Sequence, residues 1–283
     1  MLTAGAAVTT TTARLVAAGI DSARLDARLL VAEALGVGAQ TVFSHPETPL
    51  AAAQAGRLEA MVMRRAGREP VSRILGRRGF WTLELAVGPG TLDPRPDSET
   101  VVEAVLAART DRSAPLAVLD FGTGSGCLLL ALLSELPAAW GLGVDRSPSA
   151  LAVAAANARS LGLERRAAFV LGDWGGAVAG GFDVIVANPP YIPSGDIDGL
   201  EPEVAGFDPR SALDGGGDGL DCYRLLAPEI ARLLAPGGIA VLEVGQGQAA
   251  QVAALLVHSG LVAAAPRRDL GGIERCVIAG RPA

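Results

Sequence analysis

Four consecutive residues, Asn188-Pro189-Pro190-Tyr191, could together hold a planar nitrogen group. They follow the apolar run 182–187, which is typical of a buried strand that ends where an α/β sheet binds its ligand. The prolines lack N–H donors and keep the backbone extended, so the Asn188 side chain and the Pro189 carbonyl can both accept hydrogen bonds in a cavity. Tyr191 would add an aromatic face. The pattern favours methyl transfer to an amide or amino nitrogen, although an ordinary strand-to-loop exit uses the same residue types.

A second candidate segment follows an earlier apolar run and could bind a nucleotide-like cofactor. After Asp120 and Phe121 come Gly122, Thr123, Gly124, Ser125 and Gly126. Glycines let the backbone approach a ligand closely, and a helix beginning there presents free N–H groups. The dinucleotide fingerprint would need its third glycine at position 127, where Cys127 stands. The loop therefore favours S-adenosylmethionine over a dinucleotide.

Acidic residues follow the next two predicted strands. Asp145 is placed to accept hydrogen bonds from both hydroxyls of a ribose, or else to cap the following helix. Asp173 could meet the amino edge of an adenine. Trp174 could form an apolar wall beside it, or pack on the rim of the sheet. We expect these three residues to complete the cofactor site.

The elements that must position these residues alternate between strands and helices from residue 116 onward. The predicted strands are 116–121, 141–145, 168–171, 182–187, 238–244, 262–265 and 275–279. Ser147 is expected to cap one of the intervening helices, with Pro148 at its first position. This order predicts an α/β domain with a doubly wound, mainly parallel sheet. The last two strands are too close for a crossover helix, so we expect an antiparallel hairpin there.

The N-terminal part shows only helical signals. Asp21 or Ser22 can cap a helix that ends before Gly36. Its predicted apolar face is formed by Leu25, Leu29, Ala32 and Leu35. A second helix runs from about Ala51 until Gly67 and Pro70, with Leu58, Met61, Val62 and Arg65 near one another. We therefore predict a helical domain over 1–78, a connector with a hairpin over 79–115, and a catalytic domain over 116–283.

Composition excludes several classes of enzyme. All 24 basic residues are arginines, and without lysine a P-loop, a pyridoxal Schiff base or a protein kinase site is impossible. Three scattered cysteines, at 127, 222 and 276, and two histidines, at 45 and 258, match no metal site. No apolar run reaches membrane-spanning length and the N-terminus does not resemble a signal peptide, so a cytoplasmic protein is expected.

Charge argues against indiscriminate binding to nucleic acid, because the formal net charge is -6. One basic stretch nevertheless stands out, formed by Arg64, Arg65, Arg68, Arg73, Arg77 and Arg78. Such a cluster is more often a solvated face than a partner contact.

Several motifs together resemble one family, the release-factor glutamine methyltransferases, over nearly the whole chain. The resemblance rests on the helical N-terminus and on residues 92–99, 120–126, 173–174 and 188–191. It continues through residues 200–204, 212–216, 218–221, 268–270 and 274–275. Two residues depart from the family pattern: Asp93 stands where relatives usually carry an aliphatic residue, and Phe121 where they usually carry leucine. Asp93 would place a charge in a segment that we expect to be partly buried.

The resemblance implies a class I methyltransferase fold and transfer of a methyl group from S-adenosylmethionine to a glutamine side-chain amide nitrogen. The glutamine would be that of the Gly-Gly-Gln motif in class I peptide release factors, with no membrane partner and no direct sequence-specific nucleic acid. Asn188, Pro189 and Tyr191 would then be catalytic, and Pro190 would help to bind the substrate. Asn188 would also touch the cofactor.

Other functions are open on the sequence alone. The nearest alternative is methylation of adenine N6 or of a ribosomal-protein glutamine, because both use a similar Asn-Pro-Pro-Tyr device. A non-catalytic module could instead dock on a release factor or ribosome through the arginine-rich helices. A nicotinamide oxidoreductase is disfavoured by the absent third glycine of its fingerprint.

Overall fold

The computed structural model describes residues 2–282, which divide into two compact units. The helical unit holds the chain up to Arg77 together with Glu201–Phe207, and the sheet unit holds Arg78–Leu200 and the chain from Asp208 onward. The helical unit is thus built from two stretches that are far apart in the sequence.

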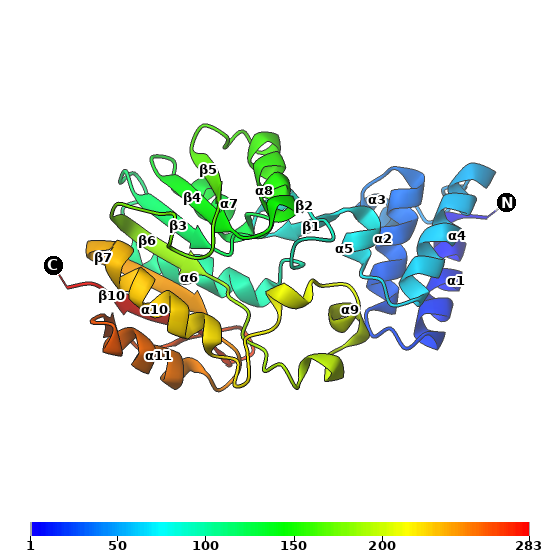
Figure 1. Cartoon of the computed structure of the whole chain (residues 1–283). Helices are drawn as coiled ribbons and strands as arrows, with labels where there is room; N and C mark the ends of the chain where they lie inside the picture. The colour runs from blue at the N-terminus through cyan, green and yellow to red at the C-terminus, as the bar shows by residue number, and fades with distance from the viewer. Residues whose placement is uncertain (1, 283) are drawn as a thin grey trace. The chain divides into compact units, whose positions relative to one another are not determined.

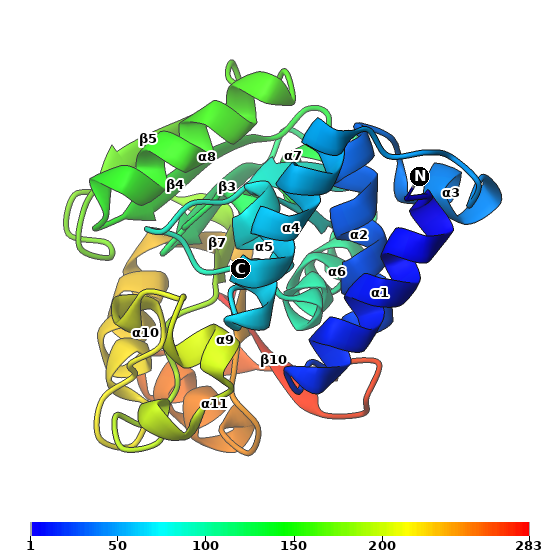
Figure 2. The same cartoon turned by 90° about the vertical axis from the view of Figure 1, so that its right-hand side faces the viewer.

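Three long helices form the body of the helical unit and lie side by side (Figure 2). Its helices are α1 (Ala4–Ala17), α2 (Ala23–Leu35), α3 (Ala39–Ser44), α4 (Ala52–Ala66), α5 (Val71–Leu75) and α9 (Pro202–Ala205). Leu15, Leu30, Val31 and Val62 lie in their shared core. Burial of these apolar side chains stabilises the unit.

The predicted apolar face of α2 is only partly right: Ala32 is buried and Leu35 packs against the core, but Leu25 is not part of the buried face. Leu25 is 57% exposed, whereas Ala27, Leu30 and Val31 are buried. The buried face is displaced because α1 and α4 both pack against α2, and small alanines allow that close approach. Ser22 does occupy the N-cap position, but its hydroxyl donates to the Asp26 carboxylate instead of capping the helix.

Helix α4 agrees with the sequence prediction, because Leu58, Val62 and Arg65 are buried on one face and Gly67 is the C-cap that follows the last helical residue. Arg65 is the unusual member, since a buried arginine needs charged partners. Its guanidinium donates to Asp26 at 2.7 Å and to Glu203 at 2.9 Å. This ion-pair group ties α2, α4 and the short helix α9 together.

Other arginines of the basic stretch also have acidic partners within their own unit. In the helical unit, Arg64 pairs with Glu69, Arg68 with Glu203 and Arg77 with Glu33. In the sheet unit, Arg78 lies 3.9 Å from Asp93. Since carboxylates of the same chain neutralise these side chains, the arginine stretch does not form an uncompensated basic face.

The sheet unit is the predicted doubly wound α/β fold (Figure 1). Within the described residues, eight strands form one sheet: β3 (Ala117–Phe121), β4 (Trp140–Asp145), β5 (Ala167–Leu171), β6 (Phe182–Ala187), β7 (Leu234–Glu243), β8 (Val262–Ala263), β9 (Arg267–Arg268) and β10 (Glu274–Gly280). Their order is β5-β4-β3-β6-β7-β10-β8, with β9 paired to β10. The strands from β5 to β7 are parallel.

The antiparallel end of the sheet confirms the predicted C-terminal pairing. β10 pairs antiparallel with both β7 and β8. Strand β6 has the predicted bounds, whereas β7 begins four residues earlier than predicted, at Leu234. The sequence prediction excluded residues 234–237 because Pro236 and Gly237 are turn formers. In the structure the register with β6 shifts at this point, so the strand continues through them.

Alternating side chains of the strands face two layers of helices. On one face, Leu119, Ile185 and Leu242 pack with α10 (Asp221–Leu233) and α11 (Ala249–His258). On the other, Val118, Val186 and Val241 pack with α6 (Glu99–Ala108), α7 (Cys127–Glu135) and α8 (Pro148–Ser160). Because side chains alternate along a strand, Asp120 and Glu243 point to the same face as Val118 and Val241.

Within the described residues, a two-stranded sheet and three 3-10 helices lie outside the main sheet. Strands β1 (Arg77–Phe80) and β2 (Leu83–Ala86) pair in a two-stranded sheet, the hairpin expected in the connector, and β1 begins two residues before the predicted start of that connector at residue 79. The 3-10 helices are η1 (Pro96–Ser98), η2 (Ile197–Gly199) and η3 (Arg210–Ala212). Ser147 and Pro148 begin α8 as predicted, and the Ser147 hydroxyl accepts from the Ala150 N–H at 3.2 Å. Across residues 2–282, no helix combines the length and apolar character needed to cross a membrane.

The buried ion pair of the helical unit generates a stability prediction. Arg65→Ala should lower the free energy of unfolding by about 3–5 kcal/mol, because it leaves Asp26 as an uncompensated buried charge. The matched control is Arg14→Ala, which breaks the exposed pair with Glu59 and should cost at most about 1 kcal/mol. Urea unfolding followed by circular dichroism measures both. Equal losses in the two variants would contradict the structural role of Arg65.

Candidate functional site

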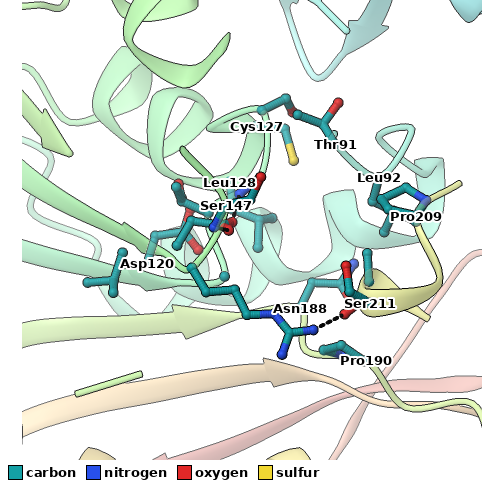
Figure 3. A pocket seen from close by; sticks show the side chains of 18 of the residues that line it. Thr91, Leu92, Asp120, Cys127, Leu128, Ser147, Asn188, Pro190, Pro209 and Ser211 are labelled. Carbon is teal, nitrogen blue, oxygen red and sulfur yellow. Dashed lines mark hydrogen bonds between the residues drawn. The ribbon is translucent and has the colours of Figure 1, made fainter. Parts of the chain in front are cut away.

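A cavity opens at the carboxyl ends of the central parallel strands, where an open α/β sheet binds its ligand. Figure 3 shows Asp120, Asn188 and Pro190 on its wall together with Pro209 and Ser211. Most residues predicted to bind the cofactor line it: Gly122, Thr123, Gly124, Ser125, Asp145, Asp173, Trp174 and Asn188. Residues far apart in the sequence thus meet in one place. Gly126 is not part of the cavity wall and forms the N-cap of α7.

The glycine loop adopts a backbone that other residues would resist. Gly122, Gly124 and Gly126 have φ of 67°, 56° and 82°, in the left-handed region that favours glycine. The opposing strand also needs a glycine, since a Cβ at Gly143 would lie 2.8 Å from the Thr123 hydroxyl oxygen. The absence of side chains at the three loop glycines allows a ligand to approach the loop backbone closely.

Asp120 is a cavity residue that the sequence did not mark as a site residue. It is 1% exposed, and burial raises its pKa to about 7 while a hydrogen bond from the Thr123 hydroxyl, at 2.6 Å, opposes the rise. Its Oδ1 atom is buried and finds no hydrogen-bond partner within residues 2–282. An acid at the end of the strand before a glycine loop was the signal that could have identified it. An unpartnered buried carboxylate oxygen on a cavity wall is suited to a cationic ligand group.

Asp145 lies on the cavity wall and accepts two backbone hydrogen bonds. Its Oδ2 accepts from the Gly124 N–H at 2.9 Å, and its Oδ1 accepts from the Ser147 N–H at 2.8 Å. The carboxylate therefore fastens the glycine loop to the start of α8. Each carboxylate oxygen has more than one acceptor position, so Asp145 can also accept from a ligand in the cavity.

Trp174 has the rare left-handed backbone conformation, with φ of 50°. A bulky residue there is strained, and such strain is concentrated at functional sites. Its ring meets Phe121 edge-on, with centroids 6.5 Å apart, while neighbouring Asp173 is exposed on the cavity wall. The wall therefore has an aromatic part and an acidic part. Phe121, one of the two departures from the family pattern, is a packing residue that supports this tryptophan.

The four residues after β6 divide between cavity and interior. Asn188 and Pro190 line the cavity, whereas Pro189 is buried and Tyr191 lies outside the cavity wall. The Tyr191 hydroxyl donates to Glu243 at 3.4 Å. Burial, with the nearby Glu243 charge as a further cause, raises the Tyr191 pKa well above its ordinary value. Tyr191 is therefore a protonated phenol at neutral pH.

Two further polar residues beside Asn188 were not marked by the sequence. The Asn188 amide Nδ2 donates to the Ser98 hydroxyl oxygen at 3.1 Å. Glu243, at the end of β7, is 1% exposed, and its burial raises its pKa to about 7, opposed by Ser98, Arg275 and Tyr191. The only available signal for Glu243 was an acid one residue before the end of the predicted strand 238–244. Ser98 belongs to the segment 92–99 that carries the family resemblance, but as a residue that precedes a helix it resembles an ordinary cap.

The cavity holds no thiol nucleophile. Cys127 and Cys222 both line it, but burial raises their pKa values to about 12 and about 11. A thiol with such a pKa is almost entirely protonated at neutral pH and is a poor nucleophile. Among the described residues, no cluster of histidine, cysteine and carboxylate side chains could hold a metal ion. The chemistry of the site therefore depends on hydrogen bonds and carboxylates.

The second departure from the family pattern, Asp93, is buried at 3% exposure. Its backbone N–H donates to Asp208 at 3.2 Å, and its Oδ2 lies 3.9 Å from Arg78. Asp208 also pairs with Arg95. The expected buried charge thus has one arginine nearby, Arg78, while Asp93 Oδ1 has no hydrogen-bond partner within residues 2–282.

Comparison with known proteins identifies both parts of the chain. The PrmC N-terminal domain family matches residues 6–76, and a methyltransferase domain family matches residues 113–260. The structure resembles the hMettl16 catalytic domain, with a TM-score of 0.58 and 14% identity over 81% of each chain. It also resembles a methyltransferase from Pyrococcus furiosus, with a TM-score of 0.51 and 17% identity over 70% of this chain and 90% of that one. The fold and the cavity define a class I S-adenosylmethionine-dependent methyltransferase.

Sequence relatives give the family. The chain is 56% identical to the release factor glutamine methyltransferase of Rhodospirillum rubrum, over 95% of this chain and 82% of that protein. It is 48% identical to the protein of the same name from Caulobacter vibrioides, over 94% and 92%. The chain belongs to the release factor glutamine methyltransferase family. The oxidoreductase and the non-catalytic docking module are therefore no longer viable alternatives.

Proposed function

We propose that this protein transfers a methyl group from S-adenosylmethionine to the side-chain amide nitrogen of the glutamine in the Gly-Gly-Gln motif of class I peptide release factors. The observation that carries the proposal is the orientation of Asn188. Its Nδ2 is engaged by Ser98, so its Oδ1 is left to accept a hydrogen bond, and no donor within residues 2–282 contacts that oxygen. An acceptor in this position suits an amide N–H of the substrate.

The residues around the glycine loop fit the methyl donor. The unpartnered Asp120 Oδ1 is suited to the donor's ammonium group, and Asp145 to its ribose hydroxyls. Trp174 and Asp173 would take its adenine, with the glycine loop leaving space for the backbone to approach. When bound, S-adenosylmethionine supplies an electrophilic methyl group on a sulfonium.

Alignment is the chemistry that the chain's own residues can supply. The amide nitrogen is a weak nucleophile because its lone pair is delocalised into the carbonyl. Asn188 Oδ1 and the Pro189 carbonyl would accept the two amide hydrogens, aim the nitrogen and stabilise the positive charge that develops on it. Such positioning can contribute on the order of 7–11 kcal/mol, so a strong general base is not required. The methylated nitrogen then loses its proton to water.

The helical unit is the part that we propose for recognition of the release factor in the cytoplasm. Residues 6–76 match a domain family distinct from the methyltransferase domain. The unit also presents large apolar side chains to solvent, including Leu25 and Phe43, at 57% and 63% exposure. Exposed apolar groups of this size are common at protein interfaces.

Mass spectrometry tests the proposed substrate. The protein should add 14 Da to the glutamine of the Gly-Gly-Gln motif when it is incubated with S-adenosylmethionine and an intact release factor. A short Gly-Gly-Gln peptide should react with a lower kcat/KM, because it lacks contacts with the helical unit. A release factor with Gln replaced by Asn is the substrate control. Modification of a different residue, or none, would overturn the proposed substrate.

Asp145→Ala should weaken S-adenosylmethionine binding by about 1.5–3 kcal/mol, the cost of a charged hydrogen bond. Loss of the contact with Gly124 would loosen the loop and act in the same direction. Calorimetry measures the affinity, and Asp183→Ala is a control that removes another strand aspartate, one that lies outside the cavity. An unchanged affinity in Asp145→Ala would reduce this residue to a helix cap.

Asn188→Ala should lower the rate of methyl transfer by about 10²- to 10³-fold, by analogy with removal of one preorganised charge-stabilising group. Asn188→Asp keeps an acceptor oxygen and adds negative charge, so it should retain more activity than the alanine variant. Single-turnover methyl transfer at saturating S-adenosylmethionine provides the rates. If Asn188→Ala reacts at nearly the wild-type rate, the residue has no aligning role.

A further inference from the structure

Asn188 can align a substrate only if its amide group is held in one orientation. An asparagine side chain has a donor end and an acceptor end of nearly the same shape, and rotation by half a turn would present N–H to the substrate in place of oxygen. The hydrogen bond from Nδ2 to the Ser98 hydroxyl, at 3.1 Å, selects the orientation with Oδ1 available.

Ser98 lies at the N-cap position of a helix, but its side chain does not cap that helix. It is the N-cap residue of α6, yet its backbone is αR and its side chain makes no capping hydrogen bond. It is 2% exposed, so its hydroxyl must find partners inside the protein. One lone pair accepts from Asn188, which leaves its proton to be donated elsewhere.

A buried acceptor near Ser98 is the Glu243 carboxylate, whose pKa the Ser98 hydroxyl lowers. Glu243 Oε2 is buried and has no hydrogen-bond partner within the described residues, so it is free to accept the Ser98 proton. The carboxylate also receives the Tyr191 hydroxyl on Oε1. Asn188, Ser98 and Glu243 form a series in which Ser98 is the middle member. The sheet brings Asn188 and Glu243 close together, because the residues before them, Ala187 of β6 and Leu242 of β7, pair in register.

We propose that Glu243 and Ser98 are positioning residues that act through Asn188: the carboxylate orients the Ser98 hydroxyl, and the hydroxyl fixes the Asn188 amide with its oxygen toward the substrate. The inference rests on the alignment role proposed for Asn188. A protonated Glu243 can donate to the Ser98 hydroxyl, and Ser98 can then donate its own proton to Asn188 Oδ1. The amide orientation that presents Oδ1 to the substrate is then no longer preferred. A charged Glu243 also polarises the series and makes Asn188 Oδ1 a better acceptor.

A titratable role for Glu243 depends on all the groups that face it. These are Asp97 and Ser98 before α6, Cys127 of α7, Tyr191 after β6, Tyr223 of α10, and Arg275 and Cys276 of β10. Arg275 is the cationic member, and it is shared with Asp97 at 3.1 Å and Asp269 at 2.9 Å. The effect of burial therefore exceeds the opposing effects of Arg275, Ser98 and Tyr191, and it raises the pKa of Glu243 to about 7.

A double-mutant cycle between Ser98 and Asn188 tests the proposal. Ser98→Ala should lower the single-turnover rate by about 3- to 10-fold at saturating S-adenosylmethionine, the range expected for one hydrogen bond, with unchanged melting temperature and cofactor affinity. In the Asn188→Ala background, the same substitution should change the rate by less than about twofold, since nothing remains to be oriented. Ser134→Ala, which removes a hydroxyl bonded within α7 outside the cavity, is the control and should react at the wild-type rate.

The pH profile supplies a second readout. The wild-type rate should rise as the pH rises through about 7 and Glu243 ionises, and Glu243→Gln should lack this rise. Multiplicative losses in the double mutant, a wild-type rate for Ser98→Ala, or a pH profile unchanged by Glu243→Gln would each overturn the positioning role. A wild-type rate for Asn188→Ala would overturn the alignment mechanism as well, so the two failures are distinguishable.

Discussion

The parallel register of β3, β6 and β7 is the constraint on which the site depends. Phe121 pairs with Ala187, and Ala187 pairs with Leu242. The next residues along the three strands, Gly122, Asn188 and Glu243, therefore come to the same edge of the sheet. A slip of one residue in β6 would turn Asn188 toward the opposite face and away from Ser98. Burial of alternating apolar side chains on both faces prevents such a slip.

Two carboxylates at this edge have unfavourable surroundings. Asp120 and Glu243 are each about 1% exposed, and burial raises both pKa values to about 7. Each also has one oxygen that lacks a partner within residues 2–282. Buried carboxyl groups of this kind reduce stability unless something compensates them. We infer that these two carboxyl groups are kept for function, because Asp120 can attract a cation and Glu243 can orient an amide.

Local patterns predicted the sheet well, because each strand of a parallel sheet is an apolar run between turn formers. The bounds of β6 and the cap of α8 follow from adjacent residues alone. Tertiary contacts explain the failures. The buried face of α2 is chosen by the helices on either side of it, and the segment Glu201–Phe207 joins the helical unit through Arg65. The partner of Ser98 is Asn188, which follows β6 and is 90 residues away in the sequence, so no local pattern reveals the contact.

A crystal structure with S-adenosylhomocysteine and a Gly-Gly-Gln peptide tests the account most directly. The central claim is that Asn188 aligns the glutamine amide while Ser98 fixes the orientation of Asn188. The account predicts that the glutamine nitrogen lies about 2.7–3.2 Å from Asn188 Oδ1, with Nδ2 still donating to Ser98. A glutamine bound away from Asn188, or an Asn188 that turns Nδ2 toward the substrate, would contradict it.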